Sequence, residues 1–169
     1  MRRMCDIYNE LVLSLKQSGL TVAVAESCTG GLVAKMITDT PGASAVFPGG
    51  MITYSNEMKI RLLNVRRETL EQFGAVSEHT VHEMLSGLKD MLKTDAGMAI
   101  SGIAGPDGGT PEKPVGTVYI GIYLNDEILV KRYHFQGSRK SVREKSALEA
   151  AAMLYERLSE NGRTERSRN

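Results

Sequence analysis

The stretch "VAVAESCTGG", from Val22 to Gly31, changes character at its midpoint. Residues 22–25 are small and apolar, which is typical of a strand buried within a sheet. A glutamate, two residues with nucleophilic side chains, a threonine and two glycines follow at once. The glycines permit a close turn into a helix, which is expected near 31–38. The order of strand, polar turn and helix predicts one unit of an α/β fold whose turn carries chemistry.

On either side of this stretch, hydrophobic periodicity predicts further helices and strands. The expected elements are a helix over 4–15 stopped by Gly19, a strand over 51–55 that feeds a helix, a helix capped by Ser77, a strand within 96–105, two strands around Asn125–Asp126, and a last helix opened by the capping box Ser141–Glu144. Strands that alternate with helices are typical of a sheet covered on both faces, and a tight hairpin makes such a sheet mixed. The sequence therefore predicts an α/β fold, a three-layer α/β/α sandwich with a mixed, mostly parallel sheet of about five strands.

Length and composition fit one globular domain. Of the 169 residues, 41% are hydrophobic and 24% are charged, which is the make-up of an ordinary globular protein. We expect a single domain over residues 1–160 and a polar tail over 161–169. The net charge of +1 argues against a nucleic-acid surface, and no apolar run approaches the length of a membrane span.

Cysteine and histidine usage argues against a disulfide framework and against a metal site. Cys5 and Cys28 lie far apart without a CxxC spacing, which favours a reducing, cytoplasmic location. His79 and His82 can share one helix face, but no third ligand lies nearby, so a solvated face is the better interpretation. No metal and no cofactor are expected.

Three polar segments follow predicted strands, namely residues 26–31, 53–59 and 101–116. In α/β sheets, ligands bind beyond the carboxyl ends of strands, so these segments are expected to meet at one edge of the sheet. The third segment contains the aperiodic stretch Gly105–Gly116, rich in proline and glycine. A long aperiodic stretch inside one domain favours a binding loop over disorder.

Ser27 and Cys28 are alternative nucleophiles in the first segment. At a turn from strand to helix, free backbone N–H groups form a cradle for an oxyanion beside the Ser27 hydroxyl. The competing interpretation is that Ser27 or Thr29 only caps the helix. A Cys28 thiolate would be stabilised at the same helix start, although a small residue there can also pack inward. The residue pattern alone leaves these alternatives open.

Lys59 is the candidate base, because no histidine lies near the end of a suitable predicted strand. A lysine with an ordinary pKa of about 10.4 is almost entirely protonated at pH 7 and cannot accept a proton. Either burial or nearby cations would lower its pKa, and Arg139 and Arg143 are the candidate cations. A solvated helix lysine is the alternative.

Arg139, Lys140 and Arg143 surround the start of the last predicted helix. Cations are unfavourable there, because a helix N-terminus prefers anions. An anionic ligand resolves this conflict, since helix N–H groups and guanidinium forks together bind phosphate well. The segment predicts a phosphate site, with an exposed basic turn as the alternative.

The strings "AESCTGGLVAKMITDTPGASAVFPGGMITYSNEMK", "GAVSE" and "SGIAGPDGGTPEKPVGTVYIG" together resemble the CinA carboxy-terminal domain family over roughly residues 5–158. Stand-alone members of that family are nicotinamide-nucleotide amidohydrolases, also called nicotinamide mononucleotide deamidases. The resemblance implies hydrolysis of the carboxamide of nicotinamide mononucleotide to nicotinate mononucleotide and ammonia. It also implies a three-layer α/β/α fold, in agreement with the prediction from periodicity.

The resemblance implies a serine–lysine site in which Ser27 is the nucleophile, Lys59 is the general base and Tyr54 lies beside them. Backbone N–H groups near Thr29 and Gly30 are expected to hold the oxyanion. The residues expected to bind substrate are Glu26, Thr29, Gly30, Ser101, Gly105, Arg139 and Arg143. The family usually has an acidic residue where this chain has Ser138.

Two other functions stay open on the sequence. One is a nucleotide-binding module without catalysis, and the other is a cysteine-dependent amidase that acts through Cys28. The expected partner is nicotinamide mononucleotide, with no nucleic acid and no membrane. The apolar helix faces are compatible with a homodimer.

Overall fold

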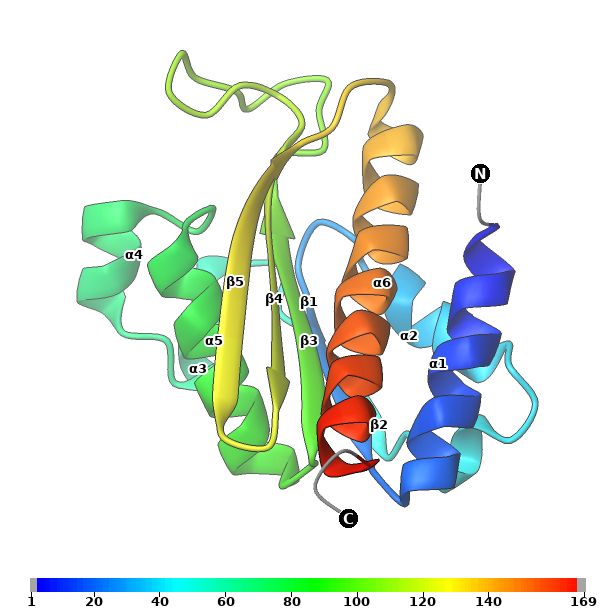
Figure 1. Cartoon of the computed structure of the whole chain (residues 1–169). Coiled ribbons are helices and arrows are strands. Elements are labelled where there is room, and N and C mark those ends of the chain that lie inside the picture. The colour runs from blue at the N-terminus through cyan, green and yellow to red at the C-terminus, as the bar shows by residue number, and fades with distance from the viewer. Residues whose placement is uncertain (1–2, 167–169) are drawn as a thin grey trace.

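The computed structural model describes residues 3–166 and places the quoted strand second in a five-stranded sheet (Figure 1). The strands are β1 (Val22–Glu26), β2 (Gly49–Ile52), β3 (Ala96–Gly102), β4 (Thr117–Leu124) and β5 (Glu127–His134), in the spatial order β2-β1-β3-β4-β5. The β2–β1 and β1–β3 pairs are parallel, whereas the β3–β4 and β4–β5 pairs are antiparallel. The prediction of a mixed sheet is confirmed, and β4 runs against the other strands.

Helices cover both faces of this sheet, as Figure 1 shows. One face carries α1 (Met4–Ser18), α2 (Leu32–Thr38) and α6 (Arg139–Arg166), and the other carries α3 (Asn56–Leu63), α4 (Arg67–Phe73) and α5 (Glu78–Leu92). The predicted three-layer α/β/α sandwich is therefore confirmed. Within residues 3–166, no helix is both long enough and apolar enough to cross a membrane.

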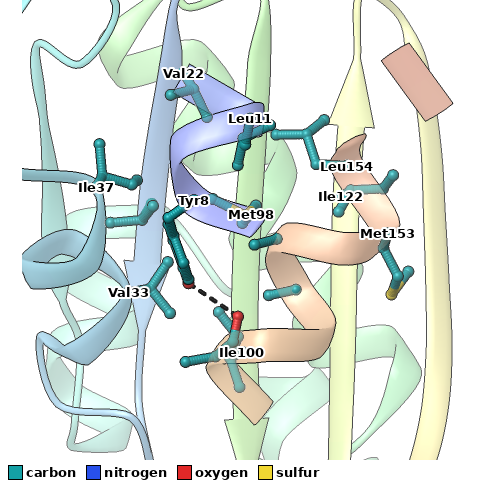
Figure 2. Close-up of a cluster of buried hydrophobic side chains, with 14 of the residues drawn as sticks. Tyr8, Leu11, Val22, Val33, Ile37, Met98, Ile100, Ile122, Met153 and Leu154 are labelled. Atoms are coloured by element: carbon teal, nitrogen blue, oxygen red, sulfur yellow. Dashed lines mark hydrogen bonds between the residues drawn. The ribbon is translucent and has the colours of Figure 1, made fainter. Parts of the chain in front are cut away.

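The alternation of side chains along β1 divides the core into two parts. Val22 and Val24 belong to a cluster with α1, α2 and α6, whereas the alanines between and after them face a cluster with α5. Tyr8 of α1 is buried in the first cluster and donates its hydroxyl hydrogen to the carbonyl of Ala147 at 2.9 Å, the dashed line in Figure 2. This bond satisfies a buried polar group and ties α1 to α6.

The strand that precedes α3 ends earlier than the sequence predicts. The Ser55 hydroxyl caps the helix by accepting a hydrogen bond from the Met58 amide at 3.1 Å. The strand expected over 51–55 is therefore β2, which begins at Gly49 and ends at Ile52. This cap sets the start of α3, and with it the length of chain between the end of β2 and Lys59.

The start and end of α6 also differ from the predictions. Ser138 accepts a hydrogen bond from the Ser141 amide at 3.2 Å, so α6 begins at Arg139 and the predicted capping box Ser141–Glu144 is wrong. A serine accepts the bond that an acidic residue at this position would accept, which accounts for the substitution in local terms. The helix continues to Arg166, into the predicted polar tail, whose last residues 167–169 lie outside the described part of the chain.

The hairpin between β4 and β5 turns at Asn125–Asp126, as predicted. Asn125 has a φ of 55°, in the left-handed region that asparagine tolerates. Lys89 of α5 donates to the Asn125 carbonyl and to the Asp126 carboxylate, so the turn is anchored to the helix.

Candidate active site

The carboxyl ends of β1, β2 and β3 meet at one edge of the sheet, because these three strands are parallel (Figure 1). A cavity of about 280 Å³ opens at this edge. The residues that line it are Ser27, Cys28, Tyr54, Lys59, Ala75, Val76, Ser101, Gly102, Ile103, Ala104, Gly105, Asp107, Gly108 and Arg139. The predicted convergence of the three polar segments is confirmed.

The structure brings Ser27 and Lys59 together. Ser27 directly follows β1, and Lys59 lies one turn into α3 with its side chain buried. The Lys59 Nζ atom is 3.1 Å from the Ser27 Oγ, 2.8 Å from the Thr53 carbonyl oxygen and 3.3 Å from the Tyr54 carbonyl oxygen. The alternative of a solvated helix lysine is therefore wrong, because this side chain is only 1% exposed.

The two carbonyls orient the Lys59 amine once it is neutral. A neutral amine has two N–H donors and one lone pair. The Thr53 and Tyr54 carbonyls accept from the two donors, which leaves the lone pair facing the Ser27 hydroxyl. In this state Lys59 is placed to accept the hydroxyl proton.

Burial lowers the pKa of Lys59 to about 8, because desolvation disfavours the ammonium form. With that pKa, about a tenth of the molecules carry a neutral Lys59 at pH 7. Desolvation is the only cause that lowers this pKa, so of the two alternatives burial acts, and the candidate cations Arg139 and Arg143 do not. The fold removes Lys59 from water instead of placing cations beside it.

Cys28 lines the cavity but is poorly suited to attack. Its side chain is buried in the apolar cluster against α1 and α6. Burial raises the pKa of the Cys28 thiol to about 12, so the thiolate is scarce at neutral pH. The stabilisation expected from a helix start does not overcome this desolvation.

Glu26 orders the turn that carries Ser27. Its fully buried carboxylate accepts hydrogen bonds from the amides of Gly31 at 3.0 Å, Val33 at 3.1 Å and Ala34 at 2.8 Å. These amides form the start of α2, which would otherwise lack partners. The carboxylate is thus occupied and does not line the cavity, so the structure offers no support for the prediction that Glu26 binds substrate.

Thr29 and Gly30 shape the same turn and also lie off the cavity. The Gly30 amide donates to the Ser27 carbonyl at 3.1 Å, so this N–H is not free to hold an oxyanion as expected. Among the described residues, the Thr29 amide has no acceptor, and the Cys28 amide interacts only with its own sulfur. These two amides are the backbone donors nearest to Ser27 that bind no other residue.

Arg139 and Arg143 have different surroundings although they lie one turn apart on α6. Arg139 lines the cavity and donates to the Gly105 carbonyl at 2.8 Å and to the Tyr54 hydroxyl at 2.9 Å. Arg143 does not line the cavity, and its guanidinium donates to the carbonyls of the Ser27 turn. The predicted phosphate site therefore has one arginine on the cavity wall.

Tyr54 and Ser101 both reach the cavity, as expected. Tyr54 is 58% exposed and forms part of the mouth. Ser101 is buried at the end of β3 and donates its hydroxyl hydrogen to the Ala75 carbonyl at 2.7 Å. Ser101 thereby links the third strand to the segment between α4 and α5.

That segment supplies wall residues that sequence reasoning missed. Ala75 and Val76 line the cavity, and Asp107 contributes a carboxylate from the Pro/Gly-rich loop. The string "GAVSE" contains the first two, yet small apolar residues before a helix carry no chemical signal of their own. In the described part of the chain, no three His, Cys, Asp or Glu side chains gather in a way that could hold a metal ion.

Comparison with known proteins identifies similar chains. The sequence model of the family described as "CinA C-terminal domain" matches residues 5–158. The chain is 49% identical over 154 residues to a CinA-like protein of Thermotoga neapolitana, and 52% identical over 140 residues to one of Kosmotoga olearia. These alignments cover 91% and 82% of this chain but 38% and 34% of the relatives, so the chain spans little more than a third of their length.

Solved structures share the fold along nearly the whole chain. A CinA superfamily protein from Klebsiella pneumoniae matches with a TM-score of 0.91 and 34% identity, covering 94% of this chain and 99% of that chain. A competence/damage inducible protein from Agrobacterium tumefaciens matches with a TM-score of 0.86 and 35% identity, covering 89% and 93%.

Proposed function

Because the chain belongs to the CinA C-terminal domain family, we propose that it is an amidohydrolase that converts nicotinamide mononucleotide to nicotinate mononucleotide and ammonia. The observation that carries the reaction class is the buried Lys59 amine 3.1 Å from the Ser27 hydroxyl. The choice of substrate comes from the resemblance of the sequence motifs to the nucleotide amidohydrolases of that family.

In the proposed first step, the Ser27 oxygen attacks the carboxamide carbon while neutral Lys59 takes the hydroxyl proton. The tetrahedral intermediate then collapses, the carbon–nitrogen bond breaks, and Lys59 returns its proton to the departing amine as ammonia leaves. An ester between Ser27 and the nicotinoyl group remains.

In the second step, water hydrolyses this ester. Lys59, neutral again, takes a proton from the water as its oxygen attacks the acyl carbon. The bond to Ser27 breaks, and the proton moves from Lys59 to the serine oxygen. The amides of Cys28 and Thr29, next to Ser27 in the turn, are the donors that would stabilise the negative oxygen in both steps.

The cysteine-dependent alternative is disfavoured by the environment of Cys28. A thiol whose pKa is raised to about 12 provides few thiolate groups at neutral pH. The non-catalytic alternative has less support, because a pure binding site needs no buried amine aimed at a hydroxyl.

The test is ammonia release from nicotinamide mononucleotide by purified protein. We expect Ser27→Ala to abolish release and Cys28→Ala to retain most of it, because only the serine contacts Lys59. Absence of release by the unmodified protein would favour the binding module. Loss in Cys28→Ala alone would favour the cysteine mechanism.

A further inference from the structure

The turn over residues 27–31 is held from two sides. On one side, the Glu26 carboxylate binds the amides at the start of α2. On the other side, Arg143 of α6 donates from Nε to the Cys28 carbonyl at 3.1 Å and from Nη2 to the Thr29 carbonyl at 2.7 Å. The planar guanidinium fork can bridge two adjacent carbonyls in this way, whereas a lysine ammonium is a single point.

Holding a carbonyl also sets the direction of the amide that shares its peptide plane. In a trans peptide, the C=O group and the following N–H point in opposite directions. Within residues 3–166 the only cis peptide precedes Pro106, so the Cys28–Thr29 peptide is trans. With its carbonyl bound to Arg143, this peptide turns the Thr29 N–H away from α6.

The neighbouring peptide is fixed by the turn itself. The Ser27 carbonyl accepts from the Gly30 amide at 3.1 Å, which sets the direction of the Cys28 N–H. The Cys28 and Thr29 amides are thus oriented by separate bonds, one internal to the turn and one from α6. Only the bond from α6, which orients the Thr29 amide, comes from a side chain distant in sequence.

We propose that Arg143 is a positioning residue, whose guanidinium orients the Thr29 amide toward the oxyanion that forms at Ser27 and does not bind the phosphate of the substrate. The inference relies on the proposed function only for the identity of the substrate. The reactivity of Ser27 can be measured without knowing that substrate. Arg143 acts through a peptide group and never touches the reacting atoms.

The placement of the two arginines supports this division of roles. Arg139 lines the cavity, so its remaining donors can meet a ligand there. Arg143 does not line the cavity, and its Nε and Nη2 donors are already engaged. A phosphate in the cavity would meet Arg139, because Arg143 is not part of the cavity wall.

The experiment measures Ser27 reactivity without the natural substrate. An alkyl fluorophosphonate probe labels an activated serine, and its reaction also places developing negative charge on an oxygen beside that serine. Labelling of Ser27 is followed by mass spectrometry in the unmodified protein, Arg143→Ala and Arg143→Lys. Lys145→Ala is the matched control, because Lys145 lies on the same helix, is exposed and donates to the Gln136 carbonyl at 2.7 Å.

We expect Arg143→Ala to slow labelling about 10²-fold, the cost of losing one oxyanion donor. Arg143→Lys, which keeps the charge and most of the packing, should still lose about tenfold or more because it cannot bridge both carbonyls. Lys145→Ala should label at the rate of the unmodified protein. If Arg143→Ala does not fold, as judged by circular dichroism, Arg143→Lys carries the test.

Steady-state kinetics separate positioning from phosphate binding. In the Arg143 variants, kcat should fall by a similar factor for nicotinamide mononucleotide and nicotinamide riboside, while KM changes little. The pH midpoint of kcat/KM should stay near that of the unmodified protein, since Lys59 keeps its surroundings.

Unchanged labelling in both Arg143 variants would overturn the inference, as would a rise in KM for the mononucleotide alone with kcat preserved. Full reactivity of Arg143→Lys would overturn the role of the guanidinium fork. If the unmodified protein is labelled at Ser27 but releases no ammonia, the proposed substrate fails, and the labelling comparison still decides the role of Arg143.

Discussion

Lys59 must be neutral to take a proton, yet it must stay close to a polar hydroxyl and two carbonyls. The structure meets both requirements by burying the side chain and giving its nitrogen three polar neighbours. Burial lowers the pKa of Lys59 to about 8, and the carbonyls fix the direction of its lone pair. Two predictions follow from this single residue.

The first concerns activity. If neutral Lys59 is the base, kcat/KM should rise with pH through about 8 and then level off, as the amine loses its proton. Lys59→Arg keeps a cation but cannot release a proton, so the rate should fall by at least about 10²-fold. The measurement is ammonia release across pH. Retention of more than about a tenth of the rate would contradict this role and make Tyr54 the next residue to test.

The second prediction concerns stability. The pKa of Lys59 falls from 10.5 to about 8 on folding, so the unfolded chain binds the extra proton between these pH values. Stability rises with pH wherever the unfolded state binds more protons. Relative to Lys59→Met, the unmodified protein should therefore gain roughly 3 kcal/mol in unfolding free energy between pH 7 and pH 10.5.

Denaturant unfolding at several pH values measures this difference. Ser27→Ala is the control, because it keeps Lys59, and its difference from the unmodified protein should stay nearly flat. A flat difference for Lys59→Met would mean that the lysine is not desolvated in the folded state.

At the scale of elements, α3 is positioned by α5. Gly87 of α5 packs against the end of α3 so closely that an added Cβ would lie 1.8 Å from the Leu63 carbonyl oxygen. Since α3 also carries Lys59, this contact determines how far the amine lies from β1. A glycine is needed here for close approach and not for its backbone conformation.

Gly87→Ala should therefore destabilise the fold and displace α3. Overpacking of this kind typically costs about 1–3 kcal/mol, which thermal unfolding can measure. Activity measured well below the melting temperature should fall as well, since Lys59 moves with the helix. The neighbouring Ser86→Ala on α5 provides the comparison and should change both quantities little. Equal activity in the two variants would show that α3 tolerates the displacement.

The order of elements could be predicted from the sequence, because periodicity and turn residues are local signals. The ends of the elements were less predictable where more than one serine could cap the same helix. Ser141–Glu144 has the spacing of a capping box, but Ser138 comes first and takes the Ser141 amide. Which serine caps a helix depends on the residue at which the preceding strand ends, and tertiary packing sets that residue.

The candidate site was predictable in part for a similar reason. Polar segments after the strands indicated this edge of the sheet, and the family resemblance then singled out Ser27 and Lys59 within them. The role of Glu26 could not be predicted, because the sequence does not show that the carboxylate next to Ser27 binds the amides at the start of α2. Nor could the sequence show that burial, and not Arg139 or Arg143, lowers the pKa of Lys59.

At the scale of the whole molecule, the cavity is assembled from segments that lie far apart in sequence. Arg139 at the start of α6 joins two of them, through the Tyr54 hydroxyl after β2 and the Gly105 carbonyl after β3. Its position on the wall makes it the arginine that is available to an anionic group. Arg139 is therefore the arginine that we expect to bind the phosphate of the substrate.

We expect the unmodified protein to use nicotinamide mononucleotide far better than nicotinamide riboside, which lacks the phosphate. Arg139→Ala should narrow that gap by up to about fivefold, because an ion pair made by an exposed arginine contributes up to about 1 kcal/mol. Arg143→Ala should leave the ratio unchanged while lowering both rates. Comparable kcat/KM values for the two substrates in the unmodified protein would argue against a phosphate site on this wall.

Translation delivers the parts of this site in a fixed order, because a chain leaves the ribosome with its amino-terminal end first. Ser27 and Lys59 emerge before the central strand β3, and Arg143 follows only after all five strands have been made. Until α6 is made, a nascent chain thus carries its serine without the guanidinium that holds the turn. Under the proposed role of Arg143, the serine of the unfinished protein reacts slowly, and full reactivity begins only when α6 packs on the sheet.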